Sequence, residues 1–66
     1  MSVPLKDQIA ELRRELRTRE RVFPRWVADG RLPQAEADRR IERLRAALES
    51  LYELDALRRP SLFDQP

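Results

Sequence analysis

Any chemistry in this 66-residue chain must come from carboxylates and guanidinium groups, because the sequence contains neither histidine nor cysteine. Those two residues supply the usual general base at neutral pH and the strongest nucleophile, and a single glycine cannot build a phosphate-binding loop. The best carboxylate pair is Glu49 and Glu53, one helical turn apart. We favour the interpretation that both are solvated surface charges facing Arg45. The sequence therefore predicts a protein that is not an enzyme and that binds no cofactor and no metal.

The first half of the chain contains a row of arginines at helical spacing, although the net charge of the whole chain is only +2. Residues 1–33 contain eight basic and five acidic residues, whereas residues 34–66 contain six and seven. On a helix the row would form an arc that can follow nucleic-acid phosphates. Its members are Arg13, Arg14, Arg17, Arg21 and Arg25. Nucleic-acid binding is our alternative hypothesis, because Glu11, Glu15 and Glu20 lie close by and charged helix faces usually serve solubility and pairing.

A second candidate site surrounds Pro24, where aromatic and arginine side chains combine in a composition typical of protein-binding hot spots. Its residues are Arg19, Arg21, Phe23, Arg25, Trp26 and Arg31. The competing interpretation is structural. The rings of Phe23 and Trp26 would pack at one end of a helix pair, against Leu32, Ala37 and Ile41. Arg25 would then be free to stack on the indole ring. Arg19 would lie on the rim of an apolar stripe and need a carboxylate, such as one across a dimer interface, or a ligand.

This segment resembles a family of short uncharacterised proteins from proteobacteria and their phages or prophages. The likeness covers roughly residues 8–54 and rests on Arg21-Val22-Phe23-Pro24-Arg25-Trp26-Val27, then Gly30-Arg31-Leu32 and Ala37-Asp38. At the position of Phe23 the family has Tyr more often than Phe. At the position of Pro33 it has Ser or Thr. The first departure removes a phenol, which weakens any site that needs a hydroxyl there. The resemblance implies a bacterial or prophage setting, where small helical proteins bind other proteins or DNA, and it carries over no activity.

The apolar residues place these candidates on helices. In the first half they recur in steps of four and three, which puts Leu5, Ile9, Leu12 and Leu16 on one side of an α-helix. The same rhythm continues through Arg19, Phe23 and Trp26, so the helical phase is not reset at Pro24. We therefore predict one helix from about residue 4 to about residue 29, kinked at this proline.

A turn over residues 30–33 and a second helix over about 33–58 should follow. Gly30 can supply a left-handed helix cap with Leu32 in hydrophobic contact, and Pro33 suits a helix start. The second stripe contains Ala37, Ile41, Leu44, Leu48 and Leu51, widened by Ala47, Leu54 and Tyr52. Two helices of about 37 Å joined by a short turn predict an all-α antiparallel hairpin over residues 1–59. In the tail, 60–66, Leu62 and Phe63 would fold back or reach a partner.

The two apolar faces have unequal widths, about 100° on the first helix and about 160° on the second. A chain this short also buries only about 60% of its unfolded surface. We therefore expect a homodimer completed as a four-helix coiled-coil bundle, although a heterologous partner would serve equally well. With no membrane span and no signal peptide in the sequence, we expect a cytoplasmic protein. The expected function is a small interaction or adaptor module of bacterial or prophage origin.

Overall fold

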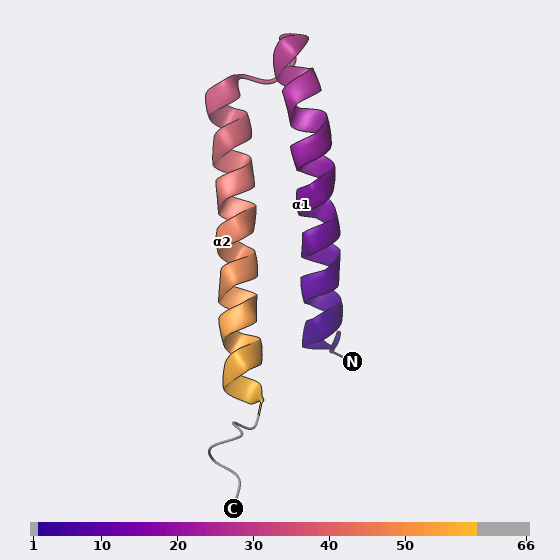
Figure 1. The fold of residues 1–66 in the computed structure, drawn as a ribbon, viewed down its shortest axis with the longest axis vertical. Coiled ribbons are helices and arrows are strands. Elements are labelled where there is room, and N and C mark those ends of the chain that lie inside the picture. Colours follow the sequence, from indigo (N-terminus) through magenta and orange to yellow (C-terminus); the bar gives the residue numbers. More distant parts are fainter. Residues whose placement is uncertain (1, 60–66) are drawn as a thin grey trace, which may run out of the picture.

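A computed structural model describes residues 2–59 as two helices that pack side by side in opposite directions (Figure 1). Helix α1 spans Leu5–Ala28 and helix α2 spans Gln34–Arg58. The predicted all-α antiparallel hairpin is therefore confirmed. The four-helix dimer stays a prediction, and the expectations for Leu62 and Phe63 lie outside the described residues.

Helix α1 begins after Pro4, whose carbonyl oxygen accepts hydrogen bonds from the backbone N–H of Asp7 at 3.0 Å and of Gln8 at 3.2 Å. The helix then continues through Pro24 without a break. Pro24 is exposed, and the apolar stripe keeps its phase on both sides of it. The kink expected at this proline stays a prediction.

The turn at the closed end of the hairpin stops α1 in the predicted way. Gly30 has φ 75°, in the left-handed region that glycine adopts without a steric penalty. Its N–H donates to the carbonyl oxygen of Val27 at 3.1 Å, and the N–H of Arg31 donates to that of Trp26 at 2.9 Å. This pair of bonds is a Schellman cap, which satisfies carbonyls that the helix end would leave unpaired. The chain then turns directly into α2.

The interior is thin and is best packed at the closed end. Phe23, Leu32 and Ala37 form a buried cluster there, with the partly buried Val22, Val27 and Ile41 packed against it. Towards the open end the buried residues are Ile9, Leu44 and Leu48. No polar or charged residue among those the structure describes is buried. The hairpin is therefore a single layer of two helices with a buried cluster at its closed end.

Candidate protein-binding surfaces

The two aromatic residues of α1 have different environments. Phe23 is 5% exposed and belongs to the closed-end cluster, as the structural interpretation predicted. Trp26 is 38% exposed, so the prediction that it also plugs the interior was wrong. Leu32 and Ala37 form the buried cluster with Phe23, whereas the indole of Trp26 is not part of this cluster. The two ring centroids are 5.6 Å apart with a 33° tilt, so the exposed indole rests on a buried phenyl ring.

Arg19 finds its partners inside the hairpin, so it needs neither a second chain nor a ligand. Its Nε donates to Glu15 Oε1 at 2.9 Å, and its Nη1 donates to the carbonyl oxygen of Arg40 at 3.4 Å. The guanidinium carbon also lies 6.0 Å from the Phe23 ring centroid. Among residues 2–59 this is the one cation–aromatic contact, in place of the expected stacking of Arg25 on Trp26. Arg19 therefore contributes to the fold, and its role as a binding residue stays a prediction.

The other arginines of the two candidate sites are exposed. Arg13, Arg17, Arg21, Arg25 and Arg31 make no ion pair with any residue in the described range 2–59. Arg14 reaches Glu11 at 3.9 Å, with both side chains more than 70% exposed. These guanidinium groups are therefore available to a partner.

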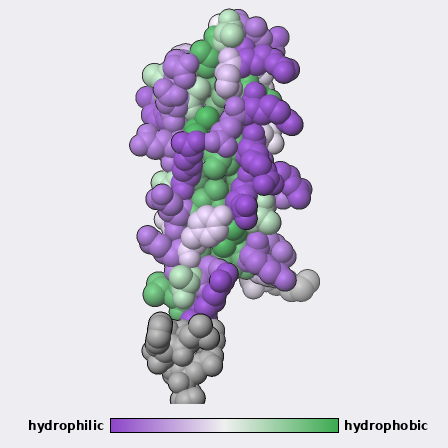
Figure 2. Space-filling view, viewed as in Figure 1, coloured by the Kyte–Doolittle hydropathy of each residue, from purple (hydrophilic) through white to green (hydrophobic). Residues whose placement is uncertain are grey.

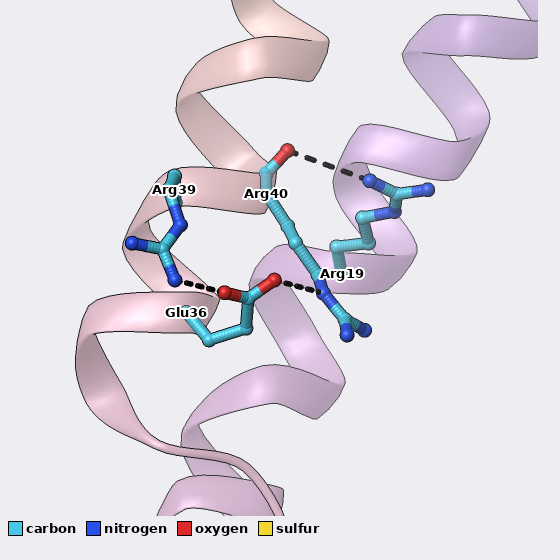
Figure 3. A network of polar contacts seen from close by, with 4 residues as sticks. All are labelled: Arg19, Glu36, Arg39 and Arg40. Carbon is cyan, nitrogen blue, oxygen red and sulfur yellow. Dashed lines mark hydrogen bonds and ion pairs between the residues drawn. The ribbon is translucent and has the colours of Figure 1, made fainter.

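A polar network joins the start of α2 to α1 (Figure 3). Glu36 accepts hydrogen bonds from Arg39 and from Arg40 Nε, the latter at 3.0 Å. The bond from Arg39, followed by that from Arg40, lowers the pKa of Glu36 from 4.5 to about 2. Arg19 reaches the same turn through the Arg40 carbonyl oxygen. The network stabilises the first turn of α2, where a carboxylate also complements the helix dipole.

A groove that sequence analysis did not find lies between the helices. It has a volume of about 340 Å³, with Leu16, Leu48 and Tyr52 among its apolar lining. Arg13 and Arg17 border it from α1, and Arg45 and Glu49 border it from α2. We call this side of the hairpin the Leu48 face. In Figure 2 an apolar band runs between the two helices and hydrophilic side chains border it on both sides.

Arg45 lines the same groove as Glu49 but forms no ion pair with Glu49 or Glu53. Arg45 Nη2 instead bonds Glu20 Oε2 at 2.6 Å, which joins α2 to α1. Glu49 and Glu53 are exposed and make no ion pair with the residues that the structure describes. Both carboxylates are exposed as predicted, and Arg45 lies beside Glu49 while its ion pair is with Glu20. The interhelical pair depends on how the helices align, which local spacing does not reveal.

Within residues 2–59 no three acidic side chains come together in a way that could hold a metal ion. Neither α1 nor α2 has an apolar stretch long enough to cross a bilayer. Comparison with protein families, curated proteins and solved structures finds no match to this chain. Function must therefore be inferred from the exposed Trp26, the unpaired arginines and the Leu48 face.

Proposed function

We propose that the chain is a small, non-catalytic adaptor of bacterial or prophage origin that binds another protein through the closed end of the hairpin. The observation that carries this proposal is the 38% exposure of Trp26, a residue type enriched in binding hot spots. Its backbone carbonyl belongs to the Schellman cap and its ring rests on Phe23. A ring fixed before binding loses little conformational entropy when the complex forms.

The exposed charges that neighbour Trp26 in the chain favour an acidic partner. Arg21, Arg25 and Arg31 are exposed in the same stretch of chain, with Asp29 as the acid between them. We call Trp26, with Arg21, Arg25 and Arg31, the closed-end patch. An apolar pocket rimmed by acidic side chains would complement it in shape and charge.

A non-catalytic role agrees with the state of Glu36. A general acid needs a raised pKa, near the pH at which it works. Glu36 has its pKa lowered to about 2 by two arginines, so it stays ionised and serves the helix start. Its chemistry is that of a structural ion pair.

Site-specific cross-linking in bacterial cells tests the closed-end patch. A photo-reactive amino acid replaces Arg25 in one variant and Glu53, near the open end, in another. We expect a defined protein adduct from position 25, lost on adding Trp26→Ala and kept on adding Leu57→Ala, which removes an apolar side chain 83% exposed. Equal adducts from both positions, or adducts that survive Trp26→Ala, would contradict the proposal.

Nucleic-acid binding is the second candidate, favoured by one observation. Arg13, Arg17, Arg21 and Arg25 follow one another at four-residue steps and have no ion pair among residues 2–59. Phosphate contacts of this kind release counterions, so affinity for duplex DNA would fall steeply as salt rises. Titration with duplex DNA at low salt decides the matter, because absence of binding there rules out this function.

A further inference from the structure

The Leu48 face extends along the hairpin as three adjoining grooves. The groove that contains Leu48 shares Arg45 with a second, which is lined by Asp38, Ile41 and Glu42. The second shares Asp38 and Ile41 with a third, which reaches Phe23 at the closed end. The first and third grooves lie between α1 and α2, and the second connects them along α2, while the apolar band of Figure 2 runs along the hairpin.

The two borders of this face carry opposite charges. Arg13 and Arg17 form the border on α1. On α2 the acidic residues Asp38, Glu42 and Glu49 line the grooves. Arg45 also lies on the α2 side, but Glu20 of the same chain pairs with it at 2.6 Å. The border on α1 is therefore basic and the border on α2 is predominantly acidic.

The size of the face suits an interface between proteins. The grooves extend over residues 34–52 of α2, about 28 Å, and two packed helices are about 20 Å wide, so the face covers about 570 Å². Protein–protein interfaces bury from about 600 Å² on each partner in weak complexes to roughly 800 Å² in stable ones. Tyr52, 44% exposed, lines the groove that contains Leu48, and a protein bound to this face would cover it.

We propose that the occupant of the Leu48 face is a second copy of the chain, with α1 of each copy lying over α2 of the other. A uniformly acidic helix would repel Glu42 and Glu49, and a uniformly basic one would repel Arg13 and Arg17. A second copy carries both signs. The twofold operation that exchanges the helices brings each basic border against an acidic one, as an isologous contact requires. Placing α1 over α1 instead would oppose like charges.

This inference gives the expected four-helix bundle a defined interface, and it is independent of the closed-end patch. The same contact would cover Arg13 and Arg17, so duplex DNA and the second copy would compete for these two residues. Trp26 lines none of the three grooves and stays open to another partner.

Two charge-reversal variants of the full chain test the proposal by sedimentation equilibrium. One carries Arg13→Glu with Arg17→Glu, and the other carries Glu42→Arg with Glu49→Arg. Each opposes like charges in its own dimer, so we expect homodimer affinity to fall at least about 100-fold. In an equimolar mixture each border again meets the opposite charge, so we expect a heterodimer.

The control for the first variant combines Arg14→Glu with Arg43→Glu, an equal change of net charge on residues that do not line the grooves. We expect it to dimerise like the original chain. Monomeric behaviour of the original chain, charge-reversal variants that dimerise as well as the control, or a mixture without heterodimer would each overturn the proposal. If either variant fails to fold alone, recovery of helical circular dichroism in the mixture supports the proposal, and absence of recovery overturns it.

Discussion

Arg45 of α2 donates a hydrogen bond to Glu20 of α1 across 2.6 Å, the one ion pair that joins the two helices within residues 2–59. It joins the helices beside the Leu48 face and neutralises the basic residue that interrupts the acidic border. Its side chains are 58% and 42% exposed, so most of its role is orientation rather than stability.

A double-mutant cycle with Arg45→Ala and Glu20→Ala should give a coupling free energy of about 0.2–1 kcal/mol at low salt. The coupling should weaken in high salt, because exposed charges are screened. Urea unfolding of the four proteins at one fixed concentration measures it. A coupling of zero at low salt would contradict a stabilising contribution from the pair.

Phe23→Ala should lower the free energy of unfolding by about 3–5 kcal/mol, because the substitution opens a cavity in the best-packed part of the interior. Trp26→Ala should lower it by only about 1–2 kcal/mol, through lost ring pairing and partial burial. Urea unfolding followed by circular dichroism compares the two variants. Equal losses would contradict the assignment of one ring to the interior and the other to the surface.

Gly30→Ala should destabilise the hairpin by about 1–2 kcal/mol, because an L-residue pays for left-handed backbone. No atom lies within 4 Å of the position that a Cβ would take, so steric contact adds nothing to this cost. Gly30→Asn should lose less, since asparagine tolerates this conformation better. Thermal unfolding ranks the three proteins, and an alanine variant as stable as the original would contradict the role given to Gly30.

Glu36 makes stability depend on acidic pH in a defined direction. Its pKa of about 2 in the folded chain lies below its ordinary value of 4.5, so protonation favours the unfolded chain. Its stabilising contribution is complete above about pH 4.5 and is lost as the pH falls towards 2. The difference in unfolding free energy between the original chain and Glu36→Gln should therefore shrink across this interval. A difference that stays constant with pH would show that the carboxylate is not held by Arg39 and Arg40.

Most of the fold could be predicted because its signals are local. The apolar stripe through Leu16 and Phe23 keeps one phase across Pro24, and such a phase is a property of neighbouring residues. Gly30 is the single glycine, and it lies where a left-handed cap was needed. Both signals can be read before any contact between the helices is known.

The sites were less predictable because they depend on how the helices pack. Whether Trp26 is covered depends on the path of the turn, which brings Leu32 beside Phe23 and leaves the indole at the edge. Arg19 had a competing partner in Glu15 on its own helix, and only the packed structure adds the carbonyl oxygen of Arg40. The Leu48 face likewise depends on the alignment of α1 with α2.

Sedimentation equilibrium of the full chain over a wide concentration range tests most directly whether one hairpin is half of a larger bundle. We predict a dimer of about twice 7.9 kDa that dissociates on dilution. Its affinity should fall as the salt concentration rises. A single species of 7.9 kDa at every concentration, with cooperative thermal unfolding, would show that one hairpin suffices and would contradict this account.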